Sequence, residues 1–377
     1  MAKLGEVFTI ASGGTPDKGN PFYYENGTIP WVKTGDLKNQ YVPAGIECIT
    51  EEGLNNSSAK LFPPNTVLVA MYGATIGACS ILSYEAATNQ ACAAFLPNEN
   101  VLPTYLYYFL SSKREQFVKD GVGGAQPNIS AGYLKNVQFG LIPMQQQIDI
   151  VEKLDKVEKL IALRKEQLAK LDQLVKSRFV ELFGDTPDEE KKTMADICKI
   201  ITDGTHQPPK FTSTGIPFLF VSNIVTNEIH YDAEKFISEE TYAELIKRTP
   251  IAIGDILLST VGSYGHPAVV KSDKPFCFQR HIAYLKPNAD MVNSEYLRGA
   301  ILSADVQRQI DERVKGIAQK TLNLSEIRKL QLPLPSMEQQ EQFAAFVEQT
   351  DKSKLAIQYS LNKLELLKKS LMQKYFG

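Results

Sequence analysis

Apolar side chains recur every seven residues in two long stretches of the chain, residues 144–184 and residues 337–377. In the first stretch, one column of this heptad consists of Leu154, Ile161, Leu168, Val175 and Leu182. In the second stretch, one column consists of Phe343, Thr350, Ile357, Leu364 and Leu371. A sustained heptad with charged residues at other positions is typical of a coiled coil. Because neither stretch has a proline or glycine before its last residue, the pattern predicts two long helices.

The two stretches are copies of one another. They align without a gap at a constant offset of 193 residues, which places Met144 on Met337 and one Phe-Gly end on the other. About 40 residues at 1.5 Å each make a rod of about 60 Å, and a polar rod of this kind needs a partner. The other copy is the obvious partner. Two unrelated surface helices are the alternative, which the gapless match disfavours.

Both stretches carry signals for helix ends. Ser336 and Gln339 have the spacing of a capping box at the start of the second helix. Gly184 and Gly377 stand where each helix is expected to stop, because glycine tolerates the left-handed conformation of a helix cap.

Each predicted helix follows a globular region with mixed strand and helix signals. In residues 1–143, the apolar runs at residues 29–32 and 67–71 are typical of buried strands, and residues 103–119 have helical spacing after a proline. The same order returns in residues 185–336. The sequence therefore predicts a mixed α/β (α+β) fold with four segments: residues 1–143, 144–184, 185–336 and 337–377.

The two globular regions match in their apolar framework and differ in their polar loops. Residues 194–197 resemble residues 4–7, residues 202–205 resemble 12–15, residues 216–219 resemble 29–32, Gln279 falls on Gln90, and residues 283–285 fall on 94–96. Loops usually carry recognition. A repeated scaffold with different loops therefore indicates one task performed on two different targets.

Composition sets outer limits on the class of protein. A chain of 377 residues with 43% hydrophobic and 22% charged residues suits a soluble protein of two or three domains. We expect no membrane span and no signal peptide, because the sequence has no long uninterrupted apolar run. The five scattered cysteines indicate neither a disulfide framework nor a zinc site, so a reducing cytoplasm is the expected location.

Charge does not by itself indicate a nucleic-acid partner. The net charge is –2, and each globular region has two more acidic than basic side chains, 11 against 9 in residues 1–143 and 20 against 18 in residues 185–336. The overall charge argument for DNA binding therefore fails, although a local basic surface stays open.

No motif for catalysis or for cofactor binding is evident. The sequence has no P-loop, and no GxGxxG follows a strand. Residues 20–23 (NPFY) and 207–210 (QPPK) each lack part of the Asn/Asp-Pro-Pro-aromatic loop of adenine methylation, so we interpret both as turns. The acidic run at residues 187–191 lies in one polar linker and is best explained as a solvated charge run. The four histidines lack i,i+4 spacing, which favours surface or recognition roles over metal binding.

The helix starts and domain starts carry a family resemblance. The motifs are residues 141–148 (LIPMQQQI) and 332–340 (LPLPSMEQQ), each followed by a long helix, together with residues 12–16 (SGGTP) and 29–32 (IPWV). Over essentially its whole length, the chain resembles the specificity subunit of type I restriction–modification systems. The first copy departs slightly, with Gln145 where the second copy has Glu338.

The resemblance implies a function and a set of partners. Each globular region would be a target-recognition domain that reads one half of a split target in double-stranded DNA. The two helices would pack as an antiparallel coiled coil, hold the domains apart with pseudo-twofold symmetry and dock two methyltransferase subunits. Those subunits would bring S-adenosylmethionine, and restriction (motor-nuclease) subunits joined through them would bring ATP- and Mg-dependent cleavage. This chain would be non-catalytic, would bind no cofactor or metal, and would read base edges while partners supply many phosphate contacts.

Candidate DNA-reading residues are the polar side chains of the loops that correspond between the two regions. In the first region they are Thr15, Lys18, Lys33, Thr34, Asp36, Tyr72, Thr75, Asn89, Gln90, Gln126 and Asn128. In the second region they are Thr205, His206, Lys210, Ser222, Asn223, Ser263, Tyr264, His266, Gln279, Arg280, His281 and Lys320. Candidate partner-binding residues at the helix starts are Gln146, Gln147, Gln339 and Gln340.

Several alternatives stay open at this point. About half of the loop residues would be merely solvated, and Tyr72 and Tyr264 have the character of core aromatics as much as of readers. Two other classes of protein fit parts of the pattern. A self-sufficient DNA-modifying enzyme is disfavoured by the missing cofactor loop, and a coiled-coil scaffold or decoy would assemble through the helices without reading DNA.

Overall fold

The computed structural model describes residues 1–122, 128–187, 190–316 and 320–377. It divides into two compact units. Unit 1 consists of Met1–Leu163 with Ser360–Gly377, and unit 2 consists of Arg164–Tyr359. Each unit therefore contains one globular region and a segment of each long helix. The predicted segment boundaries follow the sequence repeat and stay a prediction, because these units group residues by contact in space.

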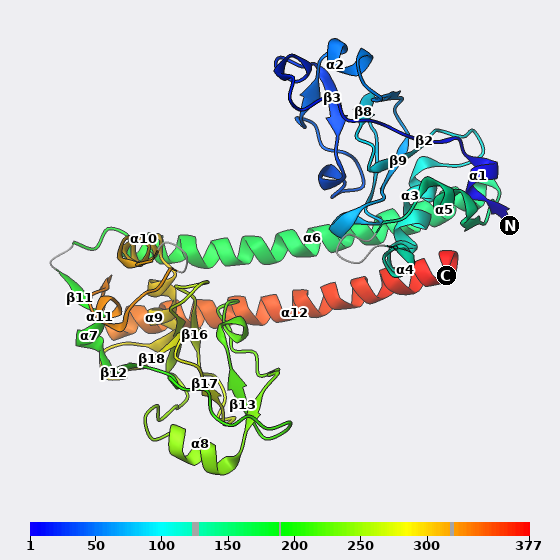
Figure 1. Cartoon of the computed structure of the whole chain (residues 1–377). Coiled ribbons are helices and arrows are strands. Elements are labelled where there is room, and N and C mark those ends of the chain that lie inside the picture. The colour runs from blue at the N-terminus through cyan, green and yellow to red at the C-terminus, as the bar shows by residue number, and fades with distance from the viewer. Residues whose placement is uncertain (123–127, 188–189, 317–319) are drawn as a thin grey trace. The chain divides into compact units, whose positions relative to one another are not determined.

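Two small sheets form the centre of unit 1 (Figure 1). The first sheet is antiparallel, in the order β2-β9-β6-β7. Its strands are β2 (Ile10–Ser12), β9 (Cys92–Phe95), β6 (Val67–Ala70) and β7 (Cys79–Ile81). The second sheet has the order β4-β3-β8-β5, in which β3 and β8 are parallel. Its strands are β4 (Cys48–Ile49), β3 (Ile29–Val32), β8 (Ala86–Thr88) and β5 (Leu61–Phe62).

Short helices complete unit 1. They are α1 (Leu4–Val7), α2 (Glu51–Asn55), α3 (Pro103–Ser112), α4 (Arg114–Asp120) and α5 (Ala131–Asn136). The strand pair β1 (Ala2–Lys3) and β10 (Gln138–Phe139) joins the two ends of the globular region. The single helix predicted over residues 103–119 is wrong in one respect. The backbone leaves the helix at Lys113, where ψ is 1°, and so divides the segment into α3 and α4.

Unit 2 repeats this plan. Its first sheet has the order β12-β18-β15-β16, and its second has the order β14-β13-β17, with β13 and β17 parallel. The strands are β12 (Cys198–Asp203), β18 (Ile282–Pro287), β15 (Ile256–Ser259), β16 (Pro267–Val269), β14 (Phe236–Ile237), β13 (Ile216–Leu219) and β17 (Cys277–Phe278). Strand β11 (Lys191–Thr193) pairs with β19 (Gln331–Pro333). The helices are α7 (Met194–Ile197), α8 (Glu239–Leu245), α9 (Ser294–Ile301), α10 (Ala304–Arg313) and α11 (Leu324–Ile327).

The central strand of the first sheet is buried on both faces in each unit. In unit 1, Val67 and Val69 of β6 belong to the core that includes helix α3, whereas Leu68 lies in the core shared with the second sheet. In unit 2, Ile256 and Leu257 of β15 are divided in the same way. This alternation follows the two-residue period of a strand. The layers are therefore helices, first sheet and second sheet, and the predicted mixed α/β class is confirmed.

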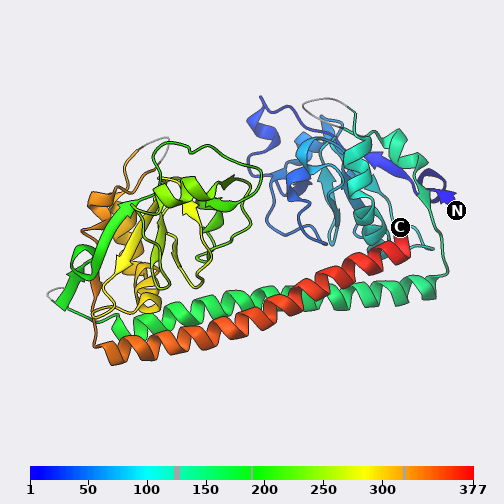
Figure 2. The ribbon, with the colours of Figure 1, turned by 90° about the horizontal axis from the view of Figure 1, so that it is seen from below.

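Two helices of 40 residues each match the heptad stretches, α6 (Met144–Phe183) and α12 (Met337–Phe376). In unit 1, Leu154 near the start of α6 shares a core with Phe376 at the end of α12. In unit 2, the rings of Phe183 at the end of α6 and Phe343 at the start of α12 lie 5.9 Å apart. Within each unit the two helix segments therefore run antiparallel, and Figure 2 shows them side by side.

The structure has some of the capping features that the sequence predicts for the helix ends. Ser336 and Gln339 form the predicted capping box, because each backbone N–H donates to the other side chain at 3.3 and 3.4 Å. The left-handed cap expected at Gly184 is wrong, since its φ is not positive. Glycine suits this position for a different reason, because a Cβ there would lie only 2.6 Å from the carbonyl oxygen of Val180. Among the helices of the described residues, none combines the length and apolar character that crossing a membrane requires.

Candidate nucleic-acid interface

Four segments of unit 2 meet at one end of its first sheet. They are the end of β12, the end of β15, the turn between β17 and β18, and the loop before α11. The N–H of Arg280 in the turn donates to the carbonyl of Thr205 at 3.0 Å. The N–H of Thr260 donates to His281 O at 2.9 Å, and the N–H of Leu322 donates to Thr260 O at 2.8 Å. Backbone bonds therefore fix the positions of all four segments.

The corresponding segments of unit 1 are joined by bonds of the same kind. The N–H of Gly14 after β2 donates to Thr88 O at 2.9 Å. The N–H of Met71 after β6 donates to Ala91 O at 2.8 Å, and the N–H of Ile129 donates to Met71 O at 2.9 Å. We call these four segments the reading loops of each unit. The frame is the same in both units, and the side chains on it differ.

The structure corrects the alignment of the two sets of reading loops by one residue. A Cβ on Gly13 would lie 1.9 Å from Thr88 O, and a Cβ on Gly204 would lie 2.3 Å from Phe278 O. Gly13 therefore corresponds to Gly204, whereas the sequence match had placed residue 203 there. By the same bonds, Gln279 corresponds to Asn89 and not to Gln90, since both donate an N–H to the parallel strand at 3.1 and 3.0 Å.

Some candidates in unit 1 lie together on the reading loops. The hydroxyl of Thr15 donates to Oε1 of Gln90 at 2.5 Å, which joins the first loop to the turn. Tyr72 is 45% exposed, so it is not a core aromatic. Tyr72 forms a backbone bridge with Asn128, whose side chain is exposed. The candidate Gln126 lies outside the described residues.

Other candidates in unit 1 have local structural roles. The carboxylate of Asp36 accepts the N–H of Lys33 at 2.8 Å, and the Lys33 ammonium forms an ion pair with Glu47. The Asn89 side chain accepts the N–H of Ala91 at 3.2 Å and so shapes the turn. These contacts use donors and acceptors that a base edge would need. The hydroxyl of Thr75 donates to its own loop, Thr34 is half-buried, and Lys18 is exposed.

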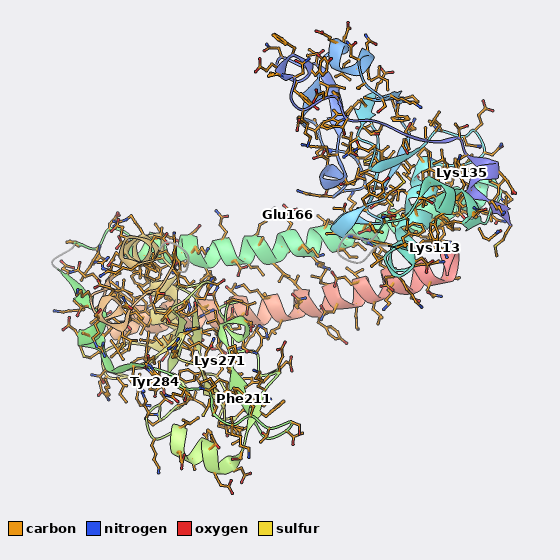
Figure 3. The ribbon with its side chains drawn as sticks, viewed as in Figure 1. Lys113, Lys135, Glu166, Phe211, Lys271 and Tyr284 are labelled. Carbon is orange, nitrogen blue, oxygen red and sulfur yellow. The ribbon has the colours of Figure 1, made fainter. Side chains whose placement is uncertain are left out.

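In unit 2 the candidates gather around two hollows beside the turn. One, of 280 Å³, is lined by polar residues that include Asp203, Thr260, Arg280, His281 and Thr321. The second, of 330 Å³, is lined by the candidates Thr205, His206, Gln279, Arg280 and His281 together with Phe211, Phe218, Phe220 and Lys235 (Figure 3 labels Phe211). Arg280 and His281, in the turn between β17 and β18, line both hollows.

Charged contacts hold the rim of these hollows. The carboxylate of Asp203 accepts a bond from Arg248 at 2.5 Å and lies 2.9 Å from Nε2 of His206. Partial burial, followed by the charge of Arg280, holds the pKa of His281 below its usual value. The lowered pKa favours the neutral ring, whose Nε2 accepts a bond from Nε of Arg280 at 3.4 Å. Burial likewise lowers the pKa of His266.

The remaining candidates in unit 2 lie farther along the loops. The amide of Asn223 donates to His230 O and Asp232 O at 3.1 and 3.2 Å, so Asn223 shapes its own loop. The hydroxyl of Tyr264 donates to Asp311 at 2.9 Å, and its half-buried ring packs on the core. His266 lies 3.3 Å from Asn227 Oδ1. Three further candidates, Lys210, Ser222 and Ser263, are exposed, as is Lys320, whose ammonium lies 6.0 Å from the Tyr264 ring.

The glutamines at the helix starts divide into two pairs. Gln147 is fully buried, and its amide bonds to Leu102 N at 2.9 Å, Asn100 O at 2.8 Å and Ile142 O at 2.9 Å. Gln340 makes the corresponding three bonds in unit 2, with Asn293 N, Met291 O and Pro335 O. Burial excludes direct contact of these two side chains with another subunit in this structure. Gln146 and Gln339 are exposed.

Sequence reasoning missed residues whose importance depends on contacts across the sheets. Asp203 and Lys235 line the hollows of unit 2, and Arg248 bonds to Asp203, yet no motif marks these three residues. Only Asp203 had a signal, because it directly precedes a glycine that the repeat singles out. The five cysteines are all free, and within the described ranges no three His, Cys, Asp or Glu side chains come together as a metal site would need.

Comparison with known proteins places this frame in a family. The sequence model of the type I restriction modification DNA specificity domain matches residues 1–173 and again residues 188–366. The chain belongs to this family. It has two specificity domains, one for each set of reading loops, and it is the specificity subunit of a type I restriction–modification system.

Individual relatives agree with the family match. The specificity subunit of the type I restriction enzyme MjaIX from Methanocaldococcus jannaschii is 25% identical over 375 residues, which cover 92% of this chain and 85% of the relative. The EcoR124I/EcoR124II specificity subunit from Escherichia coli is 30% identical over 162 residues, 42% of this chain and 40% of the relative. The similarity to MjaIX therefore spans both specificity domains.

Solved structures show the same fold. The S subunit of a type I restriction–modification system from M. genitalium superposes with a TM-score of 0.55 at 15% identity, covering 100% of this chain and 95% of that one. A chain from a structure on complex assembly and conformational transition of the type I R-M system gives 0.60 at 18% identity, covering 100% and 96%. Both comparisons cover this specificity subunit from end to end.

Proposed function

We propose that this specificity subunit reads a bipartite, asymmetric target in double-stranded DNA, with the loops of unit 1 on one half-site and those of unit 2 on the other. The observation that carries the proposal is the repeated loop frame with different side chains. Thr15 and Gln90 stand in unit 1 where His206 and Arg280 stand in unit 2. Because donors and acceptors of different geometry distinguish different base edges, the two half-sites are expected to differ in sequence.

The reading residues are proposed from their exposure and from their positions on the reading loops. In unit 2 they are His206, Gln279, Arg280 and His281 on the turn and its neighbour, with Lys210 and Lys320 at the edges. In unit 1 they are Gln90, Tyr72 and Asn128, with Thr15 holding Gln90 in position. Asp36 and Asn223 shape loops and are removed from the set of readers, because their side chains bond to their own backbone.

The chain is proposed to be non-catalytic and to work through other subunits. Two methyltransferase subunits would dock on the long helices and bring S-adenosylmethionine, and restriction subunits would join through them with ATP and Mg. The near-identical helix starts support two equivalent docking places, and exposed Gln146 and Gln339 are the candidates for contact there. The assembly is expected to lie in the cytoplasm. A complex mass corresponding to one methyltransferase at saturation contradicts this stoichiometry.

Sequencing of methylated sites in a host that expresses the chain with its methyltransferase tests the function. The expected result is one split target with unequal halves. In the matched variant Arg280→Ala with His281→Ala, only the half-site read by unit 2 should become degenerate, and the other half should stay unchanged. Methylation without a common target, or methylation by the chain alone, would overturn the proposal in favour of a scaffold or of a self-sufficient enzyme, respectively.

A further inference from the structure

Three phenylalanines and one lysine form the wall of the 330 Å³ hollow in unit 2. Phe218 is buried, and the rings of Phe211 and Phe220 pack edge-on against it at 5.3 and 5.4 Å. The ammonium of Lys235 lies 4.6 Å from the Phe211 ring and 5.8 Å from the Phe220 ring. Attraction to both ring faces holds this charge in place, at the mouth of the hollow that the reading turn also lines.

No carboxylate neutralises this charge. Across the described ranges, no acidic side chain lies within 4.0 Å, the distance of an ion pair, of the charged group of Lys235 or of Arg280, which lines the same hollow. The backbone of Lys235 is also fixed, because its carbonyl accepts the N–H of Phe218 at 3.0 Å beside β14. Two cations therefore line one hollow without a counter-ion among the described residues.

The corresponding place in unit 1 is neutral. The N–H of Trp31, which corresponds to Phe218, donates to the carbonyl of Glu47 at 2.8 Å, so Glu47 occupies the position of Lys235. Lys33 occupies the position of Phe220 and forms an ion pair with Glu47. The hydrogen bond that the Lys33 ammonium donates to the Glu47 carboxylate raises the pKa of Lys33. Gln90 stands where Arg280 stands, so the described residues at these positions of unit 1 offer a paired lysine and a neutral amide in place of two cations.

We propose that Lys235 contacts a backbone phosphate of the half-site read by unit 2, beside the bases that Arg280 reads, and that unit 1 lacks this contact because Glu47 neutralises Lys33. The inference rests on the proposed function and adds a positioning contact to it. An ammonium offers a compact charge without the directional fork of a guanidinium, so Lys235 suits a phosphate better than a base edge. Phosphate contacts fix register on the duplex and carry no sequence information directly.

The test is DNA binding by the assembled complex of specificity and methyltransferase subunits between 50 and 200 mM salt. Lys235→Gln should weaken binding to target and scrambled duplexes by the same factor. Loss of one phosphate contact should reduce the slope of log K against log salt by about 0.9, so the affinity ratio of wild type to variant should shrink about threefold over this range. Base preferences in both half-sites should stay unchanged.

Unit 1 provides the matched controls. Lys33→Gln should leave the salt slope unchanged, because the charge it removes is already paired. Glu47→Gln frees Lys33 and should steepen the slope by up to about 0.9. Lys235→Arg keeps the charge and should retain the wild-type slope, which separates the loss of charge from any loss of folding.

The outcomes are distinct. A changed base preference in the second half-site with an unchanged slope would make Lys235 a base reader and overturn the proposal. Unchanged affinity and slope for Lys235→Gln would show a merely solvated lysine and overturn it as well. If the wild-type complex fails to prefer any target over scrambled DNA, the proposed function itself fails, whatever the lysine variants do.

Discussion

Each long helix has one buried glutamine near its start, which holds the helix to the globular part of its own unit. The amides of Gln147 and Gln340 each bond to three backbone groups, and two of these belong to a segment 45 to 49 residues earlier in the chain. The sequence repeat identifies both residues, but their burial was not predictable. A glutamine in the first turn of a polar helix is ordinarily exposed, and only the folded unit shows which of two adjacent glutamines faces inward.

Gln147→Ala should therefore destabilise the protein markedly. The change removes the buried amide that bonds to the N–H of Leu102 and to the carbonyls of Asn100 and Ile142, and it leaves these part-buried backbone groups without that partner. Unsatisfied buried groups cost about 1–3 kcal/mol each, so a loss of about 2–4 kcal/mol is expected after partial relaxation. Urea unfolding followed by circular dichroism measures it. Gln146→Ala is the control, with a change within about 0.5 kcal/mol, and equal losses for both variants would contradict the assignment.

Elements were more predictable than the positions of residues within them. The heptads predicted α6 and α12, because a repeated seven-residue pattern over 40 residues leaves little ambiguity. The short strands were harder to align. Residues 202–205 were matched one position away from their true counterparts, and a one-residue shift in a strand moves every side chain to the opposite face. The bond between Phe218 of β13 and Lys235, which shows that Lys235 has the position that Glu47 has in unit 1, has no signal in a single sequence.

Helix α9 depends on a glycine for its approach to the long helices. A Cβ on Gly299 would lie 2.6 Å from Cε1 and 2.9 Å from Cζ of Phe343, whose ring is fully buried. Gly299→Ala should cost about 1–3 kcal/mol through overpacking, measured as a lower urea midpoint. In Gly132→Ala the nearest atom would be Ser130 Oγ at 3.6 Å, so this helical control should be neutral or more stable. A stable Gly299→Ala protein would show that Phe343 can move aside.

The whole molecule is one plan used twice, with charge distributed differently in each copy. The net charge of –2 gives no sign of a DNA-reading protein, since ion pairs such as Lys33–Glu47 cancel charge in one unit. In the other unit, Lys235 and Arg280 line one hollow and form no ion pair with any described residue. The net charge of the sequence cannot distinguish charges that are paired from charges that are not. The family resemblance therefore depended on the motifs at the helix starts and domain starts. These motifs were enough to predict the fold and the family, but they did not identify the individual reading residues.

The last prediction treats α6 and α12 as the element that sets the distance between half-sites. One added heptad in each helix, after Leu163 and before Ser360, falls where the two units divide and leaves the contacts within each unit intact. Seven residues keep the heptad columns in register and lengthen each helix by roughly 10 Å. Duplex DNA advances 3.4 Å per base pair, so the preferred spacer should grow by at most about three base pairs.

Affinity should nevertheless fall at the best new spacing, because about three base pairs also rotate one half-site by roughly a third of a turn, at ~10.5 base pairs per turn. The half-site sequences should stay the same, since no reading loop is altered. Methylation of a target library that varies only in spacer length measures both effects. The control is the same seven residues inserted after Gly184, outside both helices, which should keep the wild-type spacer. If the double insertion also keeps the wild-type spacer while both half-sites are still read, something other than the length of the helices sets the distance.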